Sequence, residues 1–168
     1  IGEEAYVAGH RPDISGGLFW LVDALDGTKE FIQHRNEFTV NIALVENGCP
    51  IVGVVHAPAK QLTYWGSANG AFLEEACGKR RAIQTRTPEQ DGITVVASRS
   101  HRSGEDDYLK NYNVKETINS GSSLKFCLVA AGEADLYLRL SPTSEWDTAA
   151  AQVILEEAGC VLYELKTM

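Results

Sequence analysis

The sequence lacks several features that mark common classes of protein. Its 168 residues contain no stretch approaching the roughly 18 consecutive apolar residues that cross a bilayer, and no signal peptide opens the chain. The four cysteines are scattered and form no C-x-x-C pair, which argues against a zinc site or a dithiol redox motif. These absences predict a cytoplasmic protein with reduced thiols and without stable membrane insertion.

Basic residues are too few for binding to a nucleic-acid polymer. Lys and Arg number 15 against 23 Asp and Glu, and the formal net charge is −8. Non-specific binding of nucleic acid requires a Lys/Arg surface that displaces counterions from phosphates. A small phosphorylated substrate is still compatible with this charge, because a few local cations, above all a bound divalent metal, override the global field.

Short apolar segments separated by turn residues fill most of the chain. Asn47-Gly48 between two β-branched runs predicts a hairpin, and the following runs predict that it extends into an antiparallel meander. The expected strands are 19–22, 38–45, 50–56, 62–65, 70–73, 93–97, 135–140 and 160–163. The expected helices are 28–32, 104–111, 123–131 and 147–158. This order predicts an α/β fold: an antiparallel meander lobe (1–84), a charged connection within 78–91, and a smaller mixed α/β lobe (92–168).

Asp23 and Asp26 are the first candidates for chemistry, because a turn between them could bring both carboxylates to one point. Two carboxylates 4 Å apart repel by about 4 kcal/mol at an effective dielectric constant near 20. Such a pair is stable only with a shared proton or a cation. Oxygen ligands without His or Cys suit Mg²⁺, Mn²⁺ or Ca²⁺ rather than zinc. Taken alone, the same residues are equally compatible with an Asx-type turn that caps a helix.

The helix expected to begin at Gly27-Thr28 favours the metal hypothesis. Free N–H groups at a helix N-terminus favour an anion such as phosphate. Phosphoryl hydrolysis needs a metal pair next to such an anion site, because the cations neutralise phosphate oxygens, activate water and stabilise the leaving oxygen. The Thr28 hydroxyl is placed to orient that water.

Two signatures occur in the order found in one enzyme family. They are Trp20-Leu-Val-Asp-Ala-Leu-Asp-Gly-Thr28 and Glu145-Trp-Asp-Thr-Ala-Ala-Ala-Gln152 followed by Glu157-Ala-Gly159. On these residues the chain resembles, over essentially its whole length, the lithium-sensitive, magnesium-dependent phosphatases related to inositol monophosphatase. Segments 27–32, 37–43 and 121–127 resemble the CysQ branch, whose members are 3′(2′),5′-bisphosphate nucleotidases. The resemblance implies an α+β layered sandwich of the sugar-phosphatase type, with two or three Mg²⁺ ions, Mn²⁺ as a substitute and Li⁺ as an inhibitor.

The resemblance also assigns roles to single residues. It implies metal binding by the carboxylates of Glu3, Asp23, Asp26 and Asp147 and by the backbone carbonyl of Leu25. Glu3 and Thr28 would activate and orient water, and the Gly27 and Thr28 amides would hold the phosphate. The second phosphate and the nucleoside would contact Ser122, Lys125, Arg139 and His101. The plainer alternatives are a helix N-cap for Asp147 and solvated surface charges for Lys125 and Arg139.

The chain departs from the family pattern within the first signature and at its ends. Ala24 replaces the usual proline. Because alanine restricts the unfolded chain less than proline does, folding loses more conformational entropy, which lowers stability by about 0.4–1 kcal/mol. The chain reads as a fragment that lacks the family's N-terminal helix pair and C-terminal end. Three hypotheses follow: hydrolysis of adenosine 3′,5′-bisphosphate to AMP and phosphate, hydrolysis of inositol or sugar monophosphates, or a catalytically silent truncated fragment.

Overall fold

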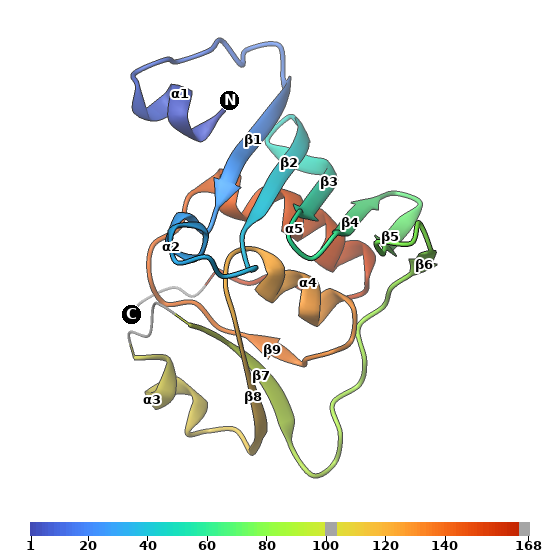
Figure 1. The fold of residues 1–168 in the computed structure, drawn as a ribbon. Helices are drawn as coiled ribbons and strands as arrows, with labels where there is room; N and C mark the ends of the chain where they lie inside the picture. The colour runs from blue at the N-terminus through green and yellow to red at the C-terminus, as the bar shows by residue number, and fades with distance from the viewer. Residues whose placement is uncertain (100–103, 165–168) are drawn as a thin grey trace.

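The computed structural model describes residues 1–99 and 104–164, and its largest unit is a six-stranded antiparallel meander (Figure 1). Each strand pairs with the next one along the chain, and the sequence predicted this meander for the four middle strands. The strands are β1 (Leu18–Asp26), β2 (Thr39–Glu46), β3 (Cys49–Ala57), β4 (Leu62–Ser67), β5 (Gly70–Glu74) and β6 (Arg80–Ala82). The short edge strand β6, which the sequence did not predict, lies within the charged segment 78–91.

The β2–β3 turn has the backbone conformation that its sequence favours. Asn47 and Gly48 have φ angles of 50° and 82°. Two consecutive residues with positive φ match the right-handed twist of the paired strands, and Asn-Gly adopts this conformation at low cost. The hairpin prediction is therefore confirmed.

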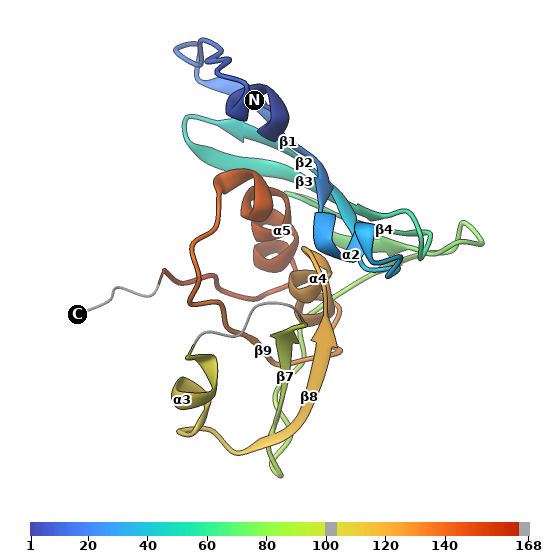
Figure 2. The same ribbon diagram turned by 60° about the vertical axis from the view of Figure 1, so that its left-hand side comes forward.

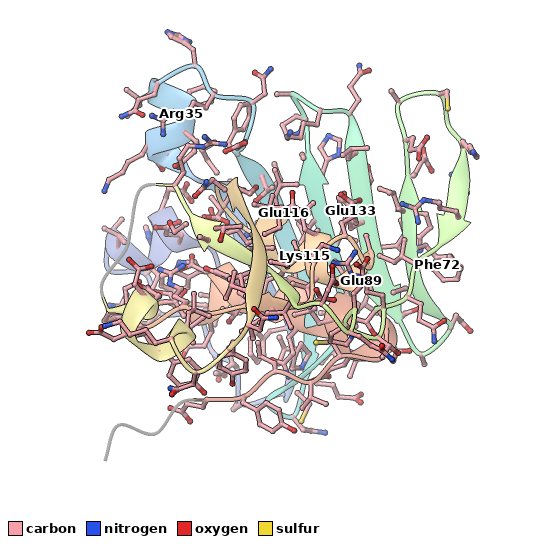
Figure 3. All side chains as sticks on the ribbon, turned by 90° about the horizontal axis from the view of Figure 1, so that it is seen from below. Arg35, Phe72, Glu89, Lys115, Glu116 and Glu133 are labelled. Carbon is pink, nitrogen blue, oxygen red and sulfur yellow. The ribbon has the colours of Figure 1, made fainter. Side chains whose placement is uncertain are left out.

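A second, smaller sheet consists of three parallel strands in the order β8-β7-β9. They are β7 (Ile93–Ser98), β8 (Val114–Ser120) and β9 (Leu136–Tyr137). The sequence did not predict β8, because four of its seven residues are exposed and no apolar alternation marks it. Its exposed Lys115 instead pairs with Glu89 at 2.5 Å and with Asp91 at 2.9 Å, as the side chains of Lys115 and Glu89 in Figure 3 illustrate.

Two other expected strands and one helix differ from the prediction. The strand expected at 135–140 shrinks to the two residues of β9. The strand expected at 160–163 is wrong: these residues follow Gly159 without regular structure and pair with none of the strands in the described residues. The helix expected at 104–111 is shorter, as α3 (Glu105–Leu109). An unpredicted helix, α1 (Glu3–Val7), precedes β1, and α2 (Thr28–Ile32) follows β1 as expected.

Helices α4 (Leu124–Ala130) and α5 (Glu145–Glu157) form the layer between the two sheets (Figures 1 and 2). Helix α5 packs against β1 to β5, and α4 contacts α5 and both sheets. This arrangement confirms the layered α/β prediction. No helix within residues 1–99 and 104–164 is long and apolar enough to cross a membrane.

Glycines allow α5 to approach the backbone of the large sheet. A Cβ added at Gly53 would lie 2.1 Å from the Ala150 carbonyl oxygen, and one at Gly66 would lie 2.8 Å from the Ile154 Cα. The helix offers small residues, Ala149 to Ala151, to the same interface. The close approach sets where the first turn of α5 lies relative to the end of β1.

We predict that Gly53→Ala destabilises the protein by about 1–3 kcal/mol, because the new methyl group has to displace the backbone of α5. For a chain of this size each kcal/mol lowers the melting temperature by about 2–4 °C. Gly16→Ala is the control, since a Cβ there meets no atom within 4 Å. Equal melting temperatures for both variants, measured by circular dichroism, would contradict the direct packing.

Candidate metal centre and binding cleft

A β-bulge at the end of β1 brings Asp23 and Asp26 together. Asp23 lies opposite Asn41 of β2 and Asp26 lies opposite Thr39, so three steps along β1 match two along β2. In a regular strand, residues three apart point to opposite faces. The extra residue of the bulge places both carboxylates on the same face. Both aspartates are part of β1, whereas the sequence predicted a strand that ends before Asp23, and the exposed Ala24 lies in the bulge.

Asp147 completes a group of three carboxylates. One carboxylate oxygen from each of Asp23, Asp26 and Asp147 lies within 4.8 Å of the other two. Asp147 is the third residue of α5, and its Oδ2 accepts the Ser144 N–H at 3.2 Å and the Thr143 hydroxyl at 2.7 Å. The N-cap is Ser144, so the alternative that made Asp147 the N-cap is wrong, although one oxygen of Asp147 takes part in a capping box with Ser144. Since these bonds use only Oδ2, Asp147 can take part in the capping box and still offer Oδ1 to a cation.

The electrostatics of the group favour a bound cation. Asp23 is 1% exposed, and its burial, followed by the charges of Asp26, Glu3 and Asp147, raises its pKa to about 7. The Leu25 N–H, which it accepts at 2.9 Å, opposes this shift. Burial also raises the pKa of Glu3, the first residue of α1, against a hydrogen bond to Asp23. Oxygen donors with this unfavourable concentration of negative charge fit a hard divalent cation such as Mg²⁺.

Polar side chains from β2 and from the residue before α4 surround Asp26. Its Oδ2 accepts the Ser123 N–H at 2.6 Å and the Ser123 hydroxyl at 2.8 Å. The Thr39 hydroxyl and the Asn41 amide lie farther from the same oxygen, at 3.4 and 3.5 Å. Sequence reasoning missed all three residues. The available signal was that Thr39 and Asn41 occupy alternate positions of a strand that is otherwise apolar up to Glu46, where buried polar groups require partners.

A cleft of about 240 Å³ opens beside Asp26 and Asp147. Seven residues that the sequence singled out line it: Asp26, Gly27, Thr28, Ser122, Lys125, Arg139 and Asp147. Glu3, Asp23 and Leu25 are not part of this lining, although the Leu25 carbonyl accepts the Thr28 hydroxyl at 3.4 Å. His101 lies outside the described residues.

The two candidate phosphate-binding cations differ in environment. Lys125 is 5% exposed, and burial lowers its pKa to about 8. Its Nζ donates to the Ser122 carbonyl at 2.6 Å, so it is not a solvated surface charge. Arg139 lines the cleft but is exposed, and its guanidinium donates to the backbone oxygen of Pro142 at 2.9 Å. Ser122 has a positive φ of 49°, and its buried hydroxyl has no hydrogen-bond partner within residues 1–99 and 104–164.

Glu37, two residues before β2, and Arg99, directly after β7, form an ion pair. The Arg99 guanidinium donates to both oxygens of Glu37, at 3.0 and 3.1 Å, and to the Asn119 carbonyl at 2.9 Å. Glu37 also accepts the Gly121 N–H at 3.0 Å, which fixes the start of the segment that carries Ser122 and Ser123. A Cβ at Gly121 would lie 2.8 Å from the Glu37 carbonyl oxygen, so this position has no room for a side chain.

Comparison with known proteins assigns a family. The model of the inositol monophosphatase family matches residues 1–167. The 3′(2′),5′-bisphosphate nucleotidase CysQ of Salmonella typhimurium is 50% identical over 147 residues, and that of Escherichia coli K12 is 49% identical. Each alignment covers 87% of this chain and 58% of the relative, so the chain spans little more than half the length of these enzymes.

Solved structures share the fold. A structure of CysQ from Bacteroides thetaiotaomicron has a TM-score of 0.80 at 38% identity. The matched region covers 95% of this chain and 65% of the CysQ chain. An inositol monophosphatase from Anabaena has a TM-score of 0.77 at 29% identity, and covers 95% of this chain and 64% of its own.

We predict that Asp23→Asn stabilises the metal-free protein and abolishes its stabilisation by Mg²⁺. The amide removes a buried charge but keeps the oxygen that accepts the Leu25 N–H. A gain of about 1 kcal/mol raises the melting temperature in EDTA by about 2–4 °C. Thermal unfolding with and without Mg²⁺ measures both effects. Asp107→Asn, which changes an exposed carboxylate, is the control. A lower melting temperature in EDTA together with an undiminished Mg²⁺ shift would contradict the site.

Proposed function

The chain belongs to the inositol monophosphatase family, and from this we propose that the protein hydrolyses phosphomonoesters with Mg²⁺. The substrate that we propose is adenosine 3′,5′-bisphosphate, whose 3′-phosphate is released to give AMP. Water forms the new bond to phosphorus, the bond from phosphorus to the 3′ oxygen breaks, and that oxygen takes up a proton. The relatives named 3′(2′),5′-bisphosphate nucleotidase CysQ support the nucleotide substrate, and the three neighbouring carboxylates support the metal requirement.

We assign the metal site to the carboxylates of Asp23, Asp26 and Asp147, with Glu3 and the Leu25 carbonyl as further ligands. When bound, Mg²⁺ supplies the positive charge that offsets both the carboxylates and the phosphate oxygens. Two or three ions, substitution by Mn²⁺ and inhibition by Li⁺ belong to the same proposal. The raised pKa of Asp23 is consistent with it, because burial and, to a smaller extent, the neighbouring carboxylates disfavour a negative charge that a cation would stabilise.

The chain's own residues would orient the reacting groups. Thr28, at the start of α2, directs its hydroxyl proton toward the Leu25 carbonyl, which leaves the oxygen's lone pairs for the attacking water. Gly27 has a φ of 88°, and a Cβ there would lie 3.1 Å from the Ser122 Cβ. Because position 27 carries no side chain, the Gly27 and Thr28 amides would be accessible to a phosphate oxygen. Glu3, whose side chain is hydrogen-bonded to Asp23, would accept a proton from the attacking water.

The environment of Lys125 is the observation that favours a bisphosphate substrate over a monophosphate. It lines the cleft with Asp26, yet within residues 1–99 and 104–164 no carboxylate forms an ion pair with it. A buried ammonium without such a partner fits an anionic ligand. Arg139 and Ser122 line the same cleft, and His101 is proposed to lie near the nucleoside.

The cleft is lined from both proposed lobes. Gly27 and Thr28 come from the lobe 1–84, and Lys125 and Arg139 come from the lobe 92–168. We propose that the substrate binds between them, so that the first lobe holds the reacting phosphate and the second holds the other one. A cytoplasmic location belongs to the same proposal, since the four cysteines are free.

The competing activities differ in substrate. An inositol monophosphatase would need no cation for a second phosphate, and the Anabaena neighbour supports that alternative at lower identity. We expect Mg²⁺-dependent phosphate release to be faster from adenosine 3′,5′-bisphosphate than from inositol 1-phosphate. We further expect Lys125→Met to lower kcat/KM for the bisphosphate by about 10–100-fold, the value of one charged hydrogen bond.

Adenosine 3′-monophosphate is the matched control for this measurement, because it lacks only the second phosphate. Lys125→Met is expected to leave its kcat/KM unchanged. An equal loss on both nucleotides would show that Lys125 does not bind the second phosphate. A preference of the unmodified protein for inositol 1-phosphate would overturn the nucleotidase assignment, and no release from any of the three would favour a catalytically silent chain.

Asp26→Asn tests the metal assignment through activity. The amide cannot supply the negative charge that a divalent cation requires, so we expect kcat to fall at least about 100-fold. Asp107→Asn removes an exposed carboxylate and is expected to retain full activity. Phosphate release by Asp26→Asn near the unmodified level would contradict the assignment.

A further inference from the structure

The Ser123 hydroxyl touches two of the three candidate metal ligands at once. Its Oγ lies 2.8 Å from Oδ2 of Asp26 and 3.0 Å from the backbone oxygen of Asp147. These residues belong to β1 and α5, and Ser123 itself stands directly before α4. Its side chain is 1% exposed, so water does not compete for these bonds. One hydroxyl therefore connects three elements that are distant in sequence.

Two buried side chains of β2 fix the direction of this hydroxyl. The Asn41 amide donates to the Ser123 Oγ at 2.9 Å, and the Thr39 hydroxyl lies 3.0 Å from Oδ1 of Asn41. Because Asn41 occupies a lone pair of Oγ, the single hydroxyl proton points away from Asn41, toward the carboxylate or the Asp147 carbonyl. A charged acceptor makes the stronger bond. The chain of donors from Thr39 through Asn41 to Ser123 thus ends on Asp26.

The contacts of Ser123, Thr39 and Asn41 with Asp26 reach the same oxygen. Oδ2 accepts two short bonds from Ser123, at 2.6 and 2.8 Å, with Thr39 and Asn41 at 3.4 and 3.5 Å. The two short bonds from Ser123 use the two lone pairs of Oδ2, and the single hydroxyl proton of Thr39 is directed to Asn41, so Oδ1 is the oxygen that a cation would take. Groups that hydrogen-bond a ligating carboxylate fix its orientation, and their loss weakens metal binding.

We propose that Ser123 is a positioning residue that orients Asp26 for a divalent cation and holds the start of α5 beside it. This inference rests on the proposed function, because it assumes that Asp26 binds metal. Ser123 itself touches neither the cation nor the substrate. Its effect is transmitted through the orientation of Asp26 and the position of Asp147.

Direct binding of Mn²⁺ tests this role without using catalysis. Free Mn²⁺ is counted by electron paramagnetic resonance during titration of the protein, of Ser123→Ala and of Ser120→Ala, well below their melting temperatures. We expect Ser123→Ala to raise the Kd about tenfold, the lower end for such partners, because the backbone N–H on Asp26 remains. Ser120, the last residue of β8, is also a buried serine, and within the described residues its hydroxyl makes only a 3.4 Å contact with the Gly121 carbonyl. Ser120→Ala is expected to change the Kd less than about twofold.

The outcomes separate this inference from the function on which it rests. Absence of Mn²⁺ binding by the unmodified protein would overturn the proposed metal function itself. Equal Kd values for the unmodified protein and Ser123→Ala would overturn only the positioning role. This conclusion would hold even if Ser123→Ala had a lower melting temperature. If Ser123→Ala does not fold, Ser123→Cys keeps the volume with a weaker donor. A raised Kd for Ser123→Cys supports the role, and an unchanged one overturns it.

Discussion

The repulsion between carboxylates gathered at one buried point is the constraint on which the rest of the site depends. Asp23 is almost completely buried, and this burial, followed by the charges of Asp26, Glu3 and Asp147, raises its pKa to about 7. An arrangement of this kind is costly in the metal-free protein, and the fold maintains it through the bulge in β1 and the packing of α5. A cation relieves the cost, which is why the carboxylates indicate metal binding rather than stability.

The same constraint explains how the surroundings are arranged. Donors from Ser123 and β2 meet one oxygen of Asp26, and the helix cap meets one oxygen of Asp147. In each case a second oxygen remains for the metal. Lys125 in the cleft donates to a backbone carbonyl, and within the described residues it forms no ion pair with a carboxylate.

Local patterns predicted the parts of the fold that local chemistry determines. Asn47-Gly48 predicted its hairpin, and the small spacing of Asp23 and Asp26 predicted a paired site although the bulge that creates it was not foreseen. Strand β8 escaped prediction because its exposed polar residues are held by pairing with β7 and not by burial. Ser123 escaped it because its partner Asp26 is 97 residues away, and the sequence of either segment carries no mark of the other.

The central claim is that Asp23, Asp26 and Asp147 bind divalent cations beside a phosphate-binding cleft. Anomalous diffraction from crystals of the protein grown with Mn²⁺ tests it most directly. The account predicts Mn²⁺ peaks within bonding distance of all three carboxylates, with Asp26 bound through Oδ1 while Oδ2 stays hydrogen-bonded to Ser123. Mn²⁺ peaks elsewhere, with these three carboxylates unbound at saturating Mn²⁺, would contradict it.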